Sequence, residues 1–284
     1  MKFKSIILIF KTSFSHWRSH RSARMGAALS YYTIFSIVPL LLLFLVIIGP
    51  ILGDNYIREA IVEQARTHIS FQTADFIKSI LRGLSEIKFN FYTIIISIGM
   101  LAAGTLGVFY ELKSSLDDLW DTKQTVKETK NWKYYVSSHM LSLSMIPILG
   151  FLLIISIVFS SLLSFVSGYS SAFAEMTFLI QIISYIFSFF VLSFLFTFIY
   201  RFLPKRKLPW RELVRGAIIT AVLFILGKFI ISIYITKLTD VSIFGAAEAF
   251  AVLLLWVFYS VQIFLFGASL TYVYSKQYGH LKQQ

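Results

Sequence analysis

The sequence contains no cysteine and few charged residues for its length. The absence of cysteine excludes disulfide frameworks and thiolate metal sites. Only 14% of the 284 residues are charged and 57% are hydrophobic, whereas soluble domains carry about 25% charged residues. A single soluble core of this length could not hide so much apolar side chain. The solvent for most of the chain is therefore expected to be lipid.

Acidic residues are scarcer than basic ones, with 14 Asp and Glu against 26 Lys and Arg and a formal net charge of +12. Such a balance can indicate a nucleic-acid partner. Here, however, the basic residues lie in short segments beside long apolar runs. That placement is typical of membrane topology signals, and we expect no nucleic-acid partner.

Six stretches have the roughly 20 mainly apolar residues that a membrane-spanning helix needs. They are about Ala28–Ile51, Phe91–Tyr110, Met140–Val166, Met176–Phe202, Leu213–Thr236 and Gly245–Tyr274. An even number of spans places both termini on one side. The sequence therefore predicts an all-α fold, a polytopic membrane protein with six transmembrane helices.

Basic residues are distributed unequally between the two sides of these spans. On the side of the termini lie 19 of them, and 6 lie in the opposite loops. The positive-inside rule places the richer side in the cytoplasm. We therefore expect a multi-pass membrane protein with both termini cytoplasmic.

Two segments outside the spans are also predicted to be helical. Residues 2–18 alternate apolar and basic positions at helical spacing, which is typical of an amphipathic helix on an anionic lipid surface. Residues 52–90 carry apolar positions at helical intervals, which predicts one or two short helices capping the outer face. The expected organisation is an interfacial helix over residues 1–24 and a six-span domain over residues 25–284.

Two ionisable residues fall within predicted spans. Lys228 lies about midway along the fifth span, and Glu248 lies near the outer end of the sixth. A charge at such a depth costs several kcal/mol unless it is paired or hydrated. We hypothesise a Lys228–Glu248 pair or a shared wet cavity. Both a structural ion pair and a substrate contact remain open.

The segment between the fourth and fifth spans is the densest motif. Pro204 and Pro209 stiffen it, and Trp210 is suited to the membrane interface. Its basic residues are Arg201, Lys205, Arg206, Lys207, Arg211 and Arg215. They are interpreted either as a topology signal or as a docking site for lipid phosphate, which arginine binds in a bidentate manner.

Small residues in the second span, among them Gly104 and Gly107, predict close packing against another helix.

Three stretches carry a resemblance to a known family. They read AALSYYTIFSIVPLLLL (Ala27–Leu43), YRFLPKRKLPWRELVRGA (Tyr200–Ala217) and FGAAEAFAVLLLWVFYSVQIFLFGASL (Phe244–Leu270). With their order and flanking spans, the sequence resembles the YihY/BrkB family of bacterial inner-membrane proteins. The resemblance implies a six-helix protein of uncertain activity. Some members carry an old ribonuclease name, others are linked to serum resistance, and one branch has been proposed to move a lipid A precursor.

The first of these stretches contains Tyr31, Tyr32 and Ser36 at the cytoplasmic entry of the first span. As aromatics of the interfacial belt the tyrosines need no further role. Their place in the family motif makes all three candidates for lipid or substrate contact.

The ribonuclease name can be tested against the residues. Metal-dependent RNA cleavage needs clustered carboxylates or histidines. The five histidines are interpreted as scattered and without ligand spacing. Asp117 and Asp121 would share a helix face with Asp118 beside them, but the interleaved lysines favour a solvated helix. We therefore expect no catalytic residues, metal or cofactor, and no enzymatic activity.

The leading hypothesis is a protein of the cell envelope that binds or translocates a lipid or other amphiphile, with anionic lipids as partners at the cytoplasmic face. A scaffolding membrane protein without a substrate path is the alternative, and a membrane-associated ribonuclease is a remote one. The sequence leaves open whether the chain forms a homo-oligomer.

Overall fold

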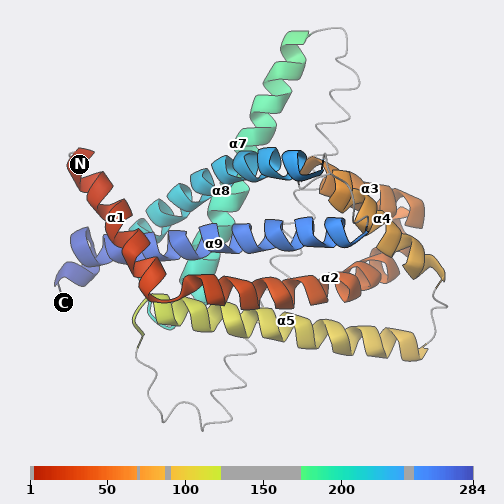
Figure 1. Ribbon diagram of the computed structural model, residues 1–284, viewed down its shortest axis with the longest axis horizontal. Coiled ribbons are helices and arrows are strands. Elements are labelled where there is room, and N and C mark those ends of the chain that lie inside the picture. The colour runs from red at the N-terminus through yellow and green to blue at the C-terminus, as the bar shows by residue number, and fades with distance from the viewer. Residues whose placement is uncertain (1–2, 69–70, 87–90, 123–173, 240–245, 284) are drawn as a thin grey trace. The chain divides into compact units, whose positions relative to one another are not determined.

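The computed structural model describes residues 3–68, 71–86, 91–122, 174–239 and 246–283. In these ranges all regular structure is helical, with eight α-helices and a terminal 3-10 turn (Figure 1). The helices are α1 (Phe3–Ser19), α2 (Ser22–Leu52), α3 (Asp54–His68), α4 (Phe71–Glu86), α5 (Phe91–Leu119), α7 (Ala174–Phe202), α8 (Trp210–Thr239) and α9 (Ala246–Tyr278). The all-α prediction is confirmed for these residues.

The chain is divided into two compact units, each assembled from segments that are distant in the sequence. Unit one comprises Met1–His20, Lys113–Ile225 and Phe264–Gln284, and unit two comprises Arg21–Leu112 and Leu226–Ile263.

Five of the six predicted spans fall on helices. Three helices are long and apolar enough to cross a membrane, over Tyr185–Phe202, Trp210–Ile231 and Phe250–Tyr278. The first and second predicted spans coincide with α2 and α5, and the third, Met140–Val166, lies outside the described residues. The chain thus has helices able to span a bilayer, while the count of six stays a prediction.

The amphipathic N-terminal helix is confirmed as α1, and one of its faces packs within unit one. Ile9 and Ser13 are buried, and the Phe10 ring lies 6.1 Å from that of Phe266 in α9. Ile7 and Phe14 are more than half exposed. Contact with a lipid surface stays a prediction for this second, exposed face.

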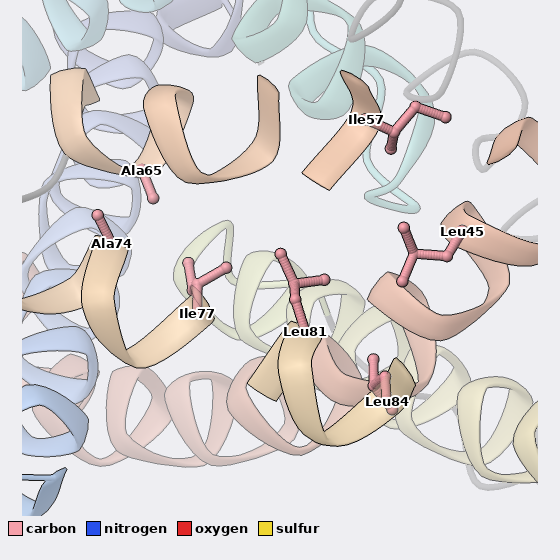
Figure 2. Packing of buried hydrophobic residues seen from close by; sticks show 7 residues of the cluster. All are labelled: Leu45, Ile57, Ala65, Ala74, Ile77, Leu81 and Leu84. Atoms are coloured by element: carbon pink, nitrogen blue, oxygen red, sulfur yellow. The ribbon is translucent and has the colours of Figure 1, made fainter. Parts of the chain in front are cut away.

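In unit two, the prediction of one or two short helices over residues 52–90 is confirmed by α3 and α4. Gly53, at a φ of +92°, separates α2 from α3, a backbone angle that glycine adopts without strain. The cap cluster joins α2, α3 and α4 (Figure 2). Its buried members are Leu45, Ile57, Ala65, Ala74, Ile77, Leu81 and Leu84. The Arg58 guanidinium also donates to the Leu81 carbonyl, so α3 and α4 share a polar contact as well.

Small residues let helices approach closely, as predicted for the second span. A Cβ atom added to Gly104 would lie 3.0 Å from that of Ser36, and one added to Gly107 would lie 2.6 Å from the Tyr32 ring. Helices α2 and α5 therefore pack with backbone against side chain in unit two. In unit one, Gly216 and Gly267 face Thr271 and Thr220 in the same way across α8 and α9.

Candidate functional site

Lys228 is half-buried on α8 in unit two. Beside it, a Cβ atom on Gly227 would lie 2.7 Å from the Tyr259 hydroxyl, so α8 and α9 approach closely here. Glu248 belongs to α9, but its side chain lies outside the described part of the chain. The Lys228–Glu248 pair therefore stays a prediction.

The tyrosine group of the first span also belongs to unit two. Tyr31 and Tyr32 are 56% and 37% exposed, and their rings meet edge to face at 5.7 Å. The Ser36 hydroxyl donates to the Thr33 carbonyl at 2.8 Å, within its own helix. The tyrosines thus present an aromatic surface, whereas the polar group of Ser36 is satisfied locally.

The basic segment between α7 and α8 lies in unit one, and its own cations hold it in shape. Lys207 Nζ donates to the carbonyl oxygens of Arg201, Phe202 and Pro204 at 3.0–3.3 Å, at the carboxyl end of α7. Arg201 Nη1 donates to the Leu208 carbonyl at 2.7 Å, and its guanidinium lies 5.2 Å over the Trp210 ring. Burial, with the neighbouring Arg201 charge, lowers the pKa of Lys207. Arg201 and Lys207 therefore stabilise the conformation of the loop through hydrogen bonds to its own carbonyl groups.

Two further basic residues tie this loop to the end of α5. The Lys205 amide donates to Asp117 Oδ1 at 2.7 Å. The Arg206 guanidinium donates to the Tyr272 hydroxyl and to the Asp121 carbonyl, each at 3.4 Å. Arg211, by contrast, is exposed in the first turn of α8 and forms no ion pair with a described residue.

The prediction of a solvated acidic helix face is confirmed for Asp118, which is exposed, and wrong for Asp117. Asp117 is only 2% exposed, and burial raises the pKa of its carboxyl despite the hydrogen bond from the Lys205 amide. Helix α5 ends at Leu119, and Asp121 has a φ of +47°. Asp117 and Asp121 therefore do not share a helix face: the first anchors the loop, and the second turns away from the helix axis.

Asp121 instead meets two histidines of the N-terminal segment. The nitrogen Nε2 of His20 lies 3.3 Å from Asp121 Oδ1, and the rings of His16 and His20 are 4.2 Å apart. The Tyr272 hydroxyl of α9 donates to Asp121 Oδ2 at 2.8 Å. We call His16, His20, Asp121 and Tyr272 the polar junction.

The interpretation of the histidines as scattered is wrong for this pair. His16 and His20 are four residues apart, a spacing that places both on one face of a helix and was the available signal. Asp121 is 101 residues further along the chain, so only the fold could assign it to them.

The junction also sets the charge of its members. Burial, reinforced by His20, lowers the pKa of His16 to about 4, so this ring is neutral near pH 7. Burial alone would raise the pKa of Asp121, but the contacts with the Tyr272 hydroxyl and the His20 ring outweigh it and leave the pKa below its ordinary value. A neutral imidazole and a carboxylate therefore lie together.

Comparisons with known proteins agree with the membrane character of the chain. Residues 13–284 match the family described as virulence factor BrkB. A UPF0761 membrane protein of Acinetobacter baylyi is 25% identical over 258 residues, covering 90% of this chain and 59% of that protein. Another from Psychrobacter is 25% identical over 251 residues, covering 87% and 44%. A third, from Pseudoalteromonas translucida, is 26% identical over 245 residues, covering 86% and 78%.

The chain spans little more than half of the Acinetobacter protein and less than half of the Psychrobacter protein. No solved structure matches it. The family match covers almost the whole chain, including the polar junction and the basic loop, and the relatives carry the name of membrane proteins. This chain therefore belongs to the BrkB family of membrane proteins.

Proposed function

We propose that the protein acts in a bacterial inner membrane, where it binds and translocates a lipid or other amphiphile with an anionic head group. The observation that carries this proposal is the start of α8, where cationic and aromatic side chains are exposed beside a helix able to span a bilayer. Trp210 is 51% exposed, and Arg211 and Arg215 are exposed next to it. An interfacial tryptophan with arginines suits a phosphate-bearing head group at the membrane surface.

The loop supports this role because it is already ordered. Lys207 and Arg201 fix its backbone through carbonyl contacts. A binding group presented from an ordered loop loses less conformational entropy when the ligand arrives. Arg211 is then the cation best placed to meet the head group, while Arg215 donates to the Tyr274 hydroxyl at 2.7 Å.

The proposed translocation depends on Lys228, a cation half-buried in α8. Intramembrane cations mark ion or substrate pathways in many membrane proteins. Pairing with Glu248 would keep Lys228 charged within the bilayer. Charge exchange tests the pair: folded protein lost in Lys228→Glu and in Glu248→Lys should return in the double variant, and no recovery would exclude direct pairing.

Lipid movement is tested with purified protein in vesicles containing a fluorescent anionic lipid. Wild type should speed transfer between leaflets, and Lys228→Ala should remove most of the increase. Arg211→Gln should reduce it at least about tenfold, since one charge-assisted contact contributes about 1.5–3 kcal/mol. Arg82→Gln is the matched control, because Arg82 is exposed on α4 in the segment assigned to the outer face. Absence of transfer by folded wild-type protein for every anionic lipid would exclude translocation.

One observation favours the scaffold alternative. Gly216 and Gly267 each face a threonine of the opposite helix so closely that a Cβ atom would overlap it. The α8–α9 contact in unit one is therefore closed to an amphiphile. If the protein is a scaffold, anionic lipid should bind at Arg211 but should not move between leaflets. The same vesicle assay distinguishes this outcome from translocation.

A further inference from the structure

The polar junction contains three groups of the kinds that bind transition metals. One ligand atom each from His16, His20 and Asp121 lie within 4.8 Å of one another. His16 Nε2 is buried and has no hydrogen-bond partner among the described residues. A buried nitrogen without a partner is costly, so this atom requires an explanation.

Hydrogen bonds determine which nitrogen of each ring is available. The Ser269 hydroxyl donates to the Ser13 carbonyl at 3.0 Å, so its oxygen accepts from His16 Nδ1, also at 3.0 Å. His20 Nδ1 lies 2.8 Å from the His16 carbonyl, which can only accept. Both Nδ1 atoms therefore carry hydrogen, so Nε2 is the atom of each ring that is left for an ion. In His20 this atom faces Asp121 Oδ1 in a hydrogen bond, and a bound ion would replace the proton between them.

The carboxylate is positioned in a comparable way. The Tyr272 hydroxyl occupies Asp121 Oδ2, and the Arg206 guanidinium contacts the backbone carbonyl of the same residue. Oδ1 remains on the side of His20, at 3.3 Å from Nε2. Outer hydrogen bonds of this kind orient the ligands of metal sites in proteins. All three side chains thus have their other polar atoms engaged.

We propose that His16, His20 and Asp121 form a binding site for a divalent first-row transition metal of the zinc class. A tetrahedral ion with bonds of about 2.0–2.1 Å separates its ligands by about 3.3–3.4 Å. The His20–Asp121 distance already has this value, and a ligand nitrogen of His16 lies within 4.8 Å of the other two ligand atoms. The fourth position remains for water.

The donor set favours such an ion over magnesium or calcium. Two imidazoles and one carboxylate suit zinc, iron or nickel, whereas hard cations require mainly oxygen ligands. The cations of Arg206 and Lys276 also lie 5.8 and 5.7 Å from the Tyr272 ring centre, and they disfavour an ion held by charge alone. Coordination to nitrogen lone pairs is less sensitive to these charges.

Binding of an ion would stabilise the position of the C-terminal end of α1. His16 and His20 occupy the last turn of α1 and the residue after it, while Asp121 follows α5. An ion between them would fix the end of the amphipathic helix within unit one. The site stands independently of the proposed lipid function, because neither Arg211 nor Lys228 belongs to it.

The test uses full-length protein purified without a polyhistidine tag, stripped with a chelator and titrated with Co²⁺. Wild type should bind one ion per chain and release it to Zn²⁺. His16→Ala should weaken binding about 100-fold or more, and Tyr272→Phe about tenfold, as expected for a ligand and for an outer hydrogen bond.

The absence of cysteine gives a second, spectroscopic test. In Asp121→Cys the new thiolate would be the only one in the chain, so Co²⁺ should produce a near-ultraviolet sulfur-to-cobalt charge-transfer band. Asp118→Cys is the matched control, because Asp118 is exposed three residues earlier and should give no band. Both positions are exposed, so these variants are expected to fold.

Two results would overturn the site. One is Co²⁺ binding by wild type no tighter than by a variant lacking both histidines. The other is the absence of a charge-transfer band in folded Asp121→Cys, or a band of equal strength in Asp118→Cys.

Discussion

The cap cluster and the polar junction both fix a short helix, but with opposite chemistry. In the cap, α3 and α4 bury aliphatic side chains against each other and against Leu45 of α2 (Figure 2). In the polar junction, His20 at the end of the N-terminal segment and Tyr272 of α9 both hydrogen-bond to Asp121, each across more than 100 positions of the sequence. Each lies within one unit, so each can be compared on its own contacts.

The difference shows how far each type of contact depends on geometry. Burial of aliphatic groups is non-directional and roughly proportional to area, so many arrangements of the cap would retain part of its stability. The polar junction is directional, and removal of one partner leaves another without its hydrogen bond. We therefore expect changes in the cap to scale with volume, and changes in the junction to depend on single atoms.

The largest effect is expected in the cap, from Leu81→Ala. Leu81 is 2% exposed at the centre of the cluster, and its truncation should lower the free energy of unfolding of the cap by about 3 kcal/mol. Hydrogen exchange over residues 54–86, in detergent, measures the change. Arg82→Ala at the exposed neighbouring position should change it by less than about 0.5 kcal/mol. Equal protection in both variants would show that the cluster does not hold α3 and α4 together.

A smaller effect is expected from Tyr272→Phe in the polar junction. The change removes only the hydroxyl that donates to Asp121 Oδ2, and it should destabilise the attachment of α1 by about 1–2 kcal/mol. Faster hydrogen exchange in the last turns of α1 would report it. Tyr278→Phe, on the exposed side of the same helix, should leave exchange unchanged. A similar effect of both variants would assign the loss to α9 as a whole rather than to one bond.

The smallest effect is expected from Arg66→Gln on α3. Arg66 Nη1 lies 3.7 Å from Glu63 Oε2, and both side chains are well exposed. Exposed ion pairs contribute little because solvent and salt screen them, so we expect a change below about 0.5 kcal/mol. The same hydrogen-exchange measurement over residues 54–86 checks it. A change as large as that of Leu81→Ala would mean that charge, rather than aliphatic burial, holds the cap.

Periodicity predicted the helical elements well because it is a local property. The amphipathic segment 2–18 became α1, and the apolar positions of residues 52–90 became α3 and α4. Gly104 and Gly107 lie in close contact with α2, as predicted, since glycine has no side chain to keep a neighbouring helix away. The sequence did not show which face of α1 packs within unit one. In the structure Ile9 and the polar Ser13 are buried, whereas the apolar Ile7 and Phe14 are exposed.

The candidate sites were predicted less well, because residue type does not reveal what a side chain contacts. Lys205 and Arg206 were interpreted as part of a topology signal or of a phosphate-docking site, and the structure adds that the Lys205 backbone amide and the Arg206 guanidinium contact Asp117, Tyr272 and Asp121. Asp117 was expected in solvent and is buried. For both predictions the deciding partners lie 66–88 residues away, beyond the reach of any local pattern.

The sequence by itself determined the solvent and the secondary structure. Long apolar runs demand lipid, and their backbone groups must then be satisfied within helices. The tertiary structure alone decided which polar groups meet. The spacing of His16 and His20 predicts that they share a helix face. Asp121 joins them only in the folded chain, because the backbone leaves α5 with a positive φ at this residue and the Tyr272 hydroxyl positions its carboxylate. Hydrogen bonds require atoms within about 3 Å, and only folding brings distant residues that close.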